Sequence, residues 1–289
     1  MPTETSTLTT QKTRNTKQLS SKLIRLLVYL SAVVTFGSLL FIILFILVRG
    51  VPYITPSLFE WNYTTDNVSL LPSLLTTLIV VGLSLLIATP IGVFTGFYLV
   101  EYADRGNKIV KAISMATDTL AAVPSIVYGL FGMLFFVTFL GFQYSVISGV
   151  LTAVIMVLPL IIRSTEEALL SVGMPLRQAS FALGAGKLRT IFTVVLPVAM
   201  PGILSGVILA SGRIVGETAA LMYTLGTSTN LPTDLFSSGR TLALHMYVLS
   251  SEGLHVNEAN ATAVVLVVFV LVINALSTYL SKRLSKGGK

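Results

Sequence analysis

Residues 178–197 read QASFALGAGKLRTIFTVVLP, a polar, small-residue segment that ends where a new apolar run begins. Gly184 and Gly186 favour a turn, because glycine adopts positive φ without steric cost and lets a partner's backbone approach closely. We therefore predict a short helix over 174–183, a glycine turn, and a second helix over 187–195. This layout suits a membrane protein that presents one short helix and turn to a soluble partner. An amphipathic connector lying on the membrane surface is the alternative.

The rest of the chain is apolar enough to define its environment. Of the 289 residues, 54% are hydrophobic and 11% are charged, too little charge to cover the surface of a water-soluble protein. A bilayer core about 30 Å thick is crossed by about 20 apolar residues in a helix. Runs of that length are found at 26–48, 71–100, 109–139, 144–162, 201–225 and 261–281. We expect an all-α, polytopic transmembrane helical bundle of about six spans.

The N-terminal region predicts an anchored first helix. The first apolar run follows basic residues, as in a signal peptide, but it is longer than an h-region of about 7–15 residues and no cleavage site follows. We expect a disordered cytoplasmic tail at 1–22, then a first transmembrane helix and an outside segment within 23–70. Most of the 19 Lys and Arg residues then lie on the cytoplasmic side, including a basic tail at 282–289. Both termini are therefore expected in the cytoplasm.

The expected core over 71–281 has two loops long enough to do more than connect spans. One is the cytoplasmic loop 163–200, which contains the opening segment, and the other is the outside loop 226–260. The outside loop is too long for a passive turn, with a re-entrant or interfacial helix as one alternative. The chain has no cysteine and its two histidines are isolated in sequence, so we expect no metal site and no cofactor.

Three ionisable residues fall inside the apolar runs. Arg213 and Glu217 are four apart, hence on one helix face and able to pair. At about 1.5 Å per residue, Asp118 lies at a similar depth to Arg213 from the cytoplasmic side. A charge at the helix centre costs at least ~2.5 kcal/mol and such groups usually line a pathway. We interpret them as an anion pathway in which Glu217 masks Arg213, with a buried ion cluster that pins two spans as the alternative. Because one Arg faces two carboxylates, we expect a second subunit to supply another cation.

The third run contains VPSIVYG at 123–129. Pro124 removes one backbone hydrogen bond and is expected to bend the span. Ser125 is expected to satisfy the carbonyls that this bend frees.

The opening segment resembles the EAA motif of ABC-importer permeases, written E-A-A-x3-G-x9-I-x-L-P. The matching residues are Ala179, Gly184, Leu196 and Pro197, and the departures are Gln178, Ser180 and Val194. In that family the helix before the glycine fits into a groove on the ATPase subunit. The resemblance implies an ATPase-coupling site made of Gln178, Ala179, Ser180, Leu183, Gly184, Ala185 and Pro197. GAGK at 184–187 lacks the Ser or Thr of a phosphate loop, so we expect no enzyme activity here and ATP hydrolysis in a separate subunit.

VPSIVYG at 123–129, together with RIVGETA at 213–219, resembles the permeases of phosphate ABC importers, closer to the PstA-type subunit than to the PstC-type. The resemblance covers nearly all of 70–281 and implies the type I ABC importer permease fold in a bacterial or archaeal plasma (inner) membrane. It implies a PstC-type permease partner, two ATPase subunits and an extracytoplasmic phosphate-binding protein, in contact with membrane lipids and without nucleic acid.

The resemblance and the buried charges together give the expected site residues. The substrate pathway is expected to contain Arg213, Glu217, Asp118, Thr218 and Ser125. Binding-protein docking is expected at Leu242, His245 and Tyr247 in the outside loop.

Two other functions stay open from the sequence. One is an ABC permease for another oxyanion, such as molybdate, tungstate or sulfate. The other is a proton-coupled secondary transporter with Asp118 and Glu217 as a relay, although no inverted repeat is evident. A membrane-embedded enzyme is disfavoured, because no nucleophile–base constellation is visible.

Overall fold

The computed structural model describes residues 5–103 and 106–286, and within these ranges every regular element is helical. Five helices are long and apolar enough to cross a membrane, or six if one sharply bent pair counts as a single span. The predicted all-α transmembrane class is therefore confirmed.

The elements follow one another along the chain with short helical extensions at several ends. The α-helices are α1 (Thr5–Gly50), α2 (Leu71–Phe97), α3 (Lys108–Ala121), α4 (Ser125–Gly132), α5 (Val146–Leu170), α6 (Met174–Ala182), α7 (Lys187–Thr190), α8 (Leu196–Val215), α9 (Ala219–Met222), α10 (Leu242–Glu252) and α11 (Val256–Lys286). The remaining turns are η1 (Val51–Tyr53) and η2 (Pro56–Phe59), which are 3-10 helical, and η3 (Tyr98–Tyr102), η4 (Met133–Phe139) and η5 (Ile191–Val195), which are π-helical.

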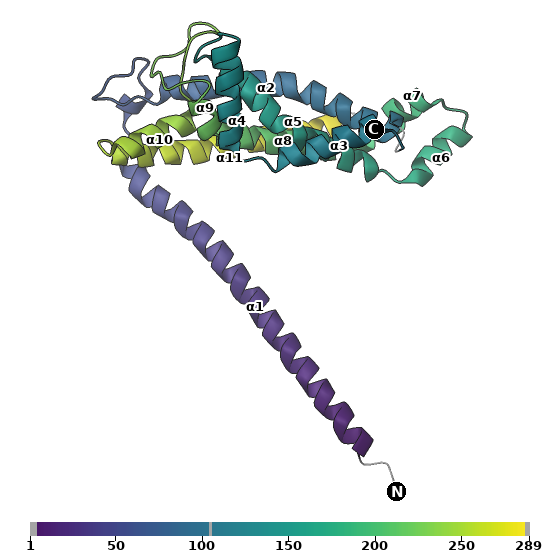
Figure 1. The fold of residues 1–289 in the computed structure, drawn as a ribbon. Coiled ribbons are helices and arrows are strands. Elements are labelled where there is room, and N and C mark those ends of the chain that lie inside the picture. Colours follow the sequence, from purple (N-terminus) through teal and green to yellow (C-terminus); the bar gives the residue numbers. More distant parts are fainter. Residues whose placement is uncertain (1–4, 104–105, 287–289) are drawn as a thin grey trace.

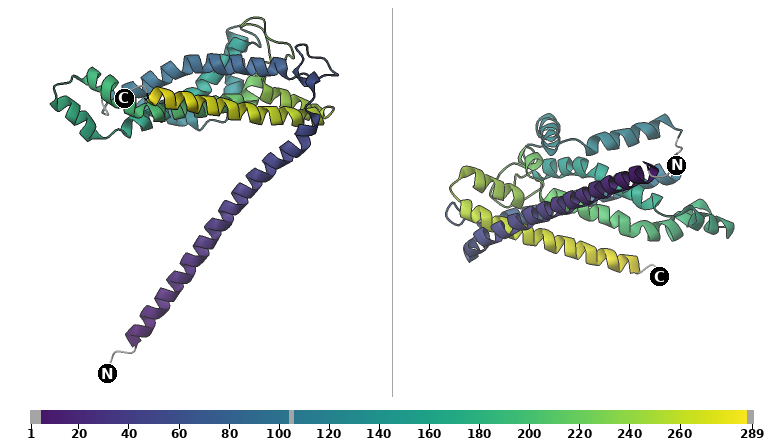
Figure 2. Two further views of the ribbon diagram at one scale, coloured as in Figure 1. Left: turned by 180° about the vertical axis from the view of Figure 1, so that it is seen from behind. Right: turned by 90° about the horizontal axis from the view of Figure 1, so that it is seen from below.

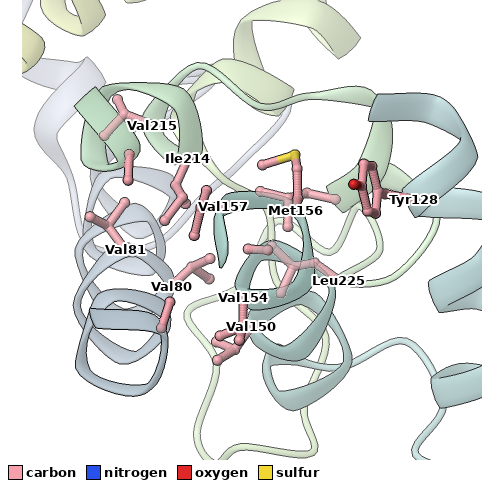
Figure 3. Packing of buried hydrophobic residues seen from close by; sticks show 14 of the residues in the cluster. Val80, Val81, Tyr128, Val150, Val154, Met156, Val157, Ile214, Val215 and Leu225 are labelled. Carbon is pink, nitrogen blue, oxygen red and sulfur yellow. The ribbon is translucent and has the colours of Figure 1, made fainter. Parts of the chain in front are cut away.

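Helix α5 lies at the centre of the bundle, with α2 and α8 packed against it and α11 beside α8 (Figure 1). Most of its apolar side chains are buried, because it is covered on several sides rather than along one stripe. In Figure 3, Val80 of α2, Val157 of α5 and Ile214 of α8 point toward one another in this core.

Glycines set how closely the neighbouring helices approach α5. Gly92 and Gly96 of α2, and Gly202 and Gly206 of α8, face α5, and a Cβ on any of them would come within 2.7 Å of an α5 side chain. Small residues four apart are a common way for membrane helices to pack, since the driving force there is close van der Waals contact. The α2–α5 and α5–α8 interfaces therefore depend on these positions having no side chain.

Helix α1 leaves the bundle instead of packing into it (Figure 2). It contacts the bundle at its C-terminal end, where Gly50 meets Asn260 and Val264 of α11. From Ile24 onward most of its apolar side chains are exposed, with Phe36 at 72%. The expected first transmembrane helix is present within α1, which begins at Thr5, and the disorder expected for 1–22 stays a prediction. Residues 1–4 and 287–289 lie outside the described residues.

The third expected span is broken rather than merely bent. Helices α3 and α4 meet at 106°, across a short break that contains Pro124. Pro124 takes an extended ψ of 142° as the residue before α4, so the chain cannot continue as one helix. The freed carbonyl of Leu120 accepts a hydrogen bond from the Tyr128 hydroxyl at 2.6 Å. Ser125 was expected to donate a hydrogen bond to a freed carbonyl. At Leu120 the donor is instead Tyr128, whose longer side chain reaches back across the break.

Two glycine-to-alanine substitutions, one at a close helix contact and one in open space, test the role of glycine in helix packing. In Gly206→Ala, the new Cβ would lie 2.3 Å from the Cβ of Ser164, and overpacking of this kind costs roughly 1–3 kcal/mol. In Gly82→Ala on α2, the new methyl group meets nothing within 4 Å, and the helix gains roughly 0.5–1 kcal/mol of propensity. We expect thermal unfolding of the purified protein in detergent to show a lower Tm for Gly206→Ala and an equal or higher Tm for Gly82→Ala. Equal Tm values for the two variants would contradict the close-packing account.

Candidate functional site

The predicted pairing of Arg213 with Glu217 is wrong, because the two residues do not share a helix. Helix α8 ends at Val215, and Glu217 lies beyond the break. The Glu217 carboxylate accepts a hydrogen bond from the Ala220 backbone N–H at 3.0 Å and is 8% exposed. An acceptor at this position satisfies one of the unpaired N–H groups at the start of α9. Glu217 therefore orders the chain after α8 and does not mask Arg213.

Asp118 pairs with Arg163 and not with Arg213. The Arg163 guanidinium contacts the carboxylates of both Asp118 and Glu166, and it also donates to the Ser114 carbonyl at 3.3 Å. A cation from a second subunit stays a prediction, and the cation that lies beside Asp118 in this chain is Arg163. It was missed because α5 continues to Leu170, so Arg163 lies in a span and not in the loop. The i,i+3 spacing of Arg163 and Glu166 was the available signal.

Arg213 lies half-buried in the last turn of α8 and lines a hollow of about 540 Å³ between α5, α8 and α11. The other lining residues are Leu160, Ser205, Ile208, Leu209, Gly212 and Asn274. Within residues 5–103 and 106–286, no hydrogen bond or ion pair is recorded for its guanidinium. The donors of Arg213 are thus open to an anion, with the Asn274 amide in the same hollow.

The two segments that carried the phosphate-permease resemblance meet in the structure. Helix α4 begins within VPSIVYG, and α9 begins within RIVGETA. At Gly129 of α4, a Cβ would lie 2.7 Å from the Ala220 Cα of α9. Ser125 and Thr218, which start these two helices, are both half-buried. Ser125, Thr218, Asp118 and Glu217 are not among the residues that line the hollow beside Arg213, so a substrate pathway shared by all five residues stays a prediction.

The helix–turn–helix predicted within loop 163–200 is present as α6 and α7, which project beyond the end of the bundle (Figure 1). Gly184 has φ of +81°, the conformation that favours glycine. The hydroxyl groups of Ser180 and Thr190 are 2.8 Å apart and close the hairpin. Gln178, Ala179 and Leu183 are exposed, with Leu183 at 89%.

The remaining residues of the expected coupling site differ in exposure. Ala185 is half-buried in the turn, and Pro197 is exposed at the start of α8. Further apolar side chains of the hairpin are exposed, namely Met174, Leu176, Phe181 and Leu188. Nothing in α6 is fully buried, so the hairpin offers an apolar surface to another molecule.

The outside loop folds differently from the expectation. Leu242 and His245 are both fully buried, so the prediction that they lie on an outside surface is wrong. Their helix, α10, packs against α11, and the rings of His245 and Tyr63 are nearly perpendicular, with their centres 6.1 Å apart. Burial, together with the nearby charge of Arg240, lowers the pKa of His245 to about 3, so the imidazole is neutral. Tyr247 is exposed, as expected.

Residues 88–287 match the family described as binding-protein-dependent transport system inner membrane component. The probable ABC transporter permease protein YqgI of Bacillus subtilis is 37% identical over 220 residues, which is 71% of this chain and 74% of that protein. Phosphate transport system permease protein PstA of Haemophilus influenzae is 31% identical over 258 residues, 88% and 91% of the two chains. PstA 1 of Mycobacterium tuberculosis (strain H37Rv) is 37% identical over 201 residues, 68% and 65% of the two chains.

Two solved transporters share the fold. An inward-facing structure of the MetNI methionine ABC transporter aligns with a TM-score of 0.58 at 20% identity, over 74% of this chain and 93% of that one. A bacterial alginate ABC transporter in complex with an alginate-bound periplasmic protein aligns with a TM-score of 0.59 at 17% identity, over 88% and 95%. With its helical bundle, projecting hairpin and matched residues 88–287, this chain belongs to the family of binding-protein-dependent transport system inner membrane components.

Proposed function

We propose that this chain is the permease subunit of an ATP-driven importer of inorganic phosphate, in which it forms half of the translocation pathway. The observation that carries the proposal is the hairpin α6–α7, an exposed apolar surface at the end of a membrane bundle. The names of the relatives, phosphate transport system permease proteins, support phosphate as the substrate. An ATPase subunit supplies the energy, since the residues of a phosphate loop are lacking in this chain.

The exposed surfaces suggest where the partners bind. The hairpin α6–α7 is the surface for an ATPase subunit, one of two in the complex. The exposed apolar sides of α1 require lipid or a second, PstC-type permease subunit, because α1 contacts its own bundle at one end. An extracytoplasmic phosphate-binding protein docks at the opposite end of the bundle, where Tyr247 and Leu254 are exposed.

The orientation follows from the hairpin. If α6–α7 contacts an ATPase, that end of the bundle faces the cytoplasm. The C-terminal end of α11 lies at the same end, and α1 points its N-terminal end away from the outside segment (Figure 1). Both termini are then cytoplasmic, in agreement with the distribution of basic residues, and the chain lies in the plasma (inner) membrane of a bacterium or archaeon.

Transport requires a contact that forms and breaks during the cycle. An incoming phosphate oxygen accepts charge-assisted hydrogen bonds from Arg213, whose guanidinium has no carboxylate partner among the described residues. The ATP-driven motion of α6 reaches α5 and α8, the helices that line the hollow around Arg213. A change in the spacing of these helices would weaken the contact and release phosphate toward the cytoplasm.

A proton relay between Asp118 and Glu217 receives less support. Asp118 is held by Arg163, whereas Glu217 accepts from a backbone N–H, and no recorded interaction joins them in the described part of the chain. Transport of another oxyanion is compatible with the same geometry. The identity of the substrate is tested by measuring whether phosphate stimulates the ATPase activity of the reconstituted complex. Stimulation by molybdate or sulfate in place of phosphate would show that the substrate is another oxyanion.

Removing the charge of Arg213 should lower transport without disturbing assembly. Hydrogen bonds to charged groups contribute about 1.5–3 kcal/mol, so we expect Arg213→Gln to reduce phosphate uptake by proteoliposomes about 10- to 100-fold. Arg213→Lys should recover part of the loss. Arg49→Gln, which changes an exposed residue near the C-terminal end of α1, is the control and should transport normally. Normal uptake by Arg213→Gln would contradict the role of Arg213.

Placing a charge on the hairpin should prevent the ATPase from binding. Leu183 is 89% exposed, so Leu183→Asp leaves the fold intact but puts a carboxylate in an apolar interface. We expect the ATPase subunit to stop co-purifying with the tagged permease. Leu254, at the other end of the bundle, is 81% exposed, and Leu254→Asp should retain the ATPase. Retention of the ATPase by both variants would place its binding surface elsewhere.

A further inference from the structure

One side chain of the coupling helix α6 reaches into the bundle. All residues of α6 are exposed except Arg177 and Ser180, which are half-buried. Ser180 bonds within the hairpin, to Thr190. Arg177 instead forms an ion pair with Glu101, at 2.8 Å from Nη2 to Oε1. Contact between α6 and the bundle therefore depends heavily on the Arg177 side chain.

The same guanidinium binds the end of α5. It donates to the Leu169 carbonyl at 2.9 Å and also to the Val172 carbonyl just beyond the helix. The last carbonyls of a helix lack intrahelical partners and carry partial negative charge, so a cation there is doubly favourable. Arg177 thus joins α6 to the C-terminal end of the central helix.

Glu101 belongs to the end of α2. It lies in the π-helical turn η3, which continues α2 to Tyr102. A second contact joins the hairpin to the same turn, where the Lys187 ammonium lies 4.6 Å from the centre of the Tyr102 ring. Arg177 therefore connects α6 with both α5 and α2, the two helices whose close packing forms the core of the bundle.

The surroundings of the Arg177–Glu101 ion pair favour transmission of a displacement of α6 through this pair. A hollow of about 590 Å³ lies beneath the hairpin, lined by Val100, Glu101, Leu170, Val172, Gly173, Met174, Arg177, Phe181 and Lys187. The hairpin is therefore not seated on the bundle by a close-packed apolar face. The side chains of Arg177 and Glu101 are 11% and 10% exposed, the least exposed ion pair recorded in the described residues. Breaking such a pair leaves an uncompensated charge, so the pair resists separation when α6 moves.

We propose that Arg177 and Glu101, with the carbonyls of Leu169 and Val172, form a joint that transmits displacement of α6 to the ends of α5 and α2. This Arg177 joint rests on the proposed function, because it assigns the route by which an ATPase would move the pathway helices. Arg177 and Glu101 are positioning residues, since they touch neither phosphate nor nucleotide. Their loss uncouples ATP hydrolysis from transport and leaves the exposed apolar surface of the hairpin unchanged.

The test compares Glu101→Gln, Arg177→Gln and the double variant in the purified complex with its ATPase and permease partners. The readout is the amount of ATP hydrolysed for each phosphate transported into proteoliposomes. We expect this ratio to rise about tenfold in each single variant while the ATPase still co-purifies. The double variant should be no worse than Arg177→Gln, because residues that act through one contact are not additive. Glu167→Gln in α5 and Lys111→Gln in α3 change exposed charges outside the hairpin; they are the controls and should keep the wild-type ratio.

Three results would overturn the Arg177 joint. The first is an unchanged ratio in Glu101→Gln and Arg177→Gln, the second is loss of the ATPase from these variants, and the third is additive effects in the double variant. Amide hydrogen exchange in the purified permease keeps this test separate from that of phosphate import. We expect faster exchange at 174–182 and at 97–102 together in both single variants, and unchanged exchange at either segment would contradict the joint. If both single variants show this linked change in exchange but the wild-type complex takes up no phosphate, only the proposed function is contradicted.

Discussion

Inside a bilayer the backbone can be satisfied only by its own helix, and neighbouring helices gain stability by approaching closely. In this chain that approach is set by glycines of α2 and α8 against α5. Because α5 is enclosed on these sides, the close packing places its C-terminal end at the end of the bundle that carries the hairpin α6–α7. Arg163, Glu166 and the carbonyl of Leu169 lie on that last part of α5. The ion pair with α3 and the contact with α6 are thus both placed by the same close-packed helix.

The two breaks in the spans have a common location. The first separates α3 from α4 and the second separates α8 from α9, and α4 packs directly on α9. Irregular backbone at membrane depth is tolerated where protein covers it or where it lines a cavity. Here Tyr128 and Glu217 satisfy groups freed at these breaks, at the Leu120 carbonyl and the Ala220 N–H. The two motifs that resembled a phosphate permease therefore include the residues at which these two breaks occur.

The sequence predicted what depends on local features. The apolar runs predicted the spans, and Gly184 predicted the turn between α6 and α7. Both predictions rest on the length, hydropathy or backbone φ of a few neighbouring residues. Features that depend on distant contacts were mispredicted. The i,i+4 pairing of Arg213 with Glu217 assumed an unbroken helix, and the exposure of His245 was assumed without the Tyr63 ring that covers it. The Arg177–Glu101 pair joins residues 76 positions apart, which no periodicity reveals.

The charge balance explains why Arg213 suits transient anion binding. An Arg held by carboxylates, as Arg163 is by Asp118 and Glu166, offers an anion little net attraction. A fully buried Arg without a partner would be too costly to insert into the membrane. Arg213 lies between these extremes, because it is half-buried beside a hollow and sits in the last turn of α8, where the helix carbonyls favour a positive charge. Those carbonyls stabilise the cation without pairing with it as a carboxylate would, which supports the proposal that Arg213 binds phosphate in a contact weak enough to break.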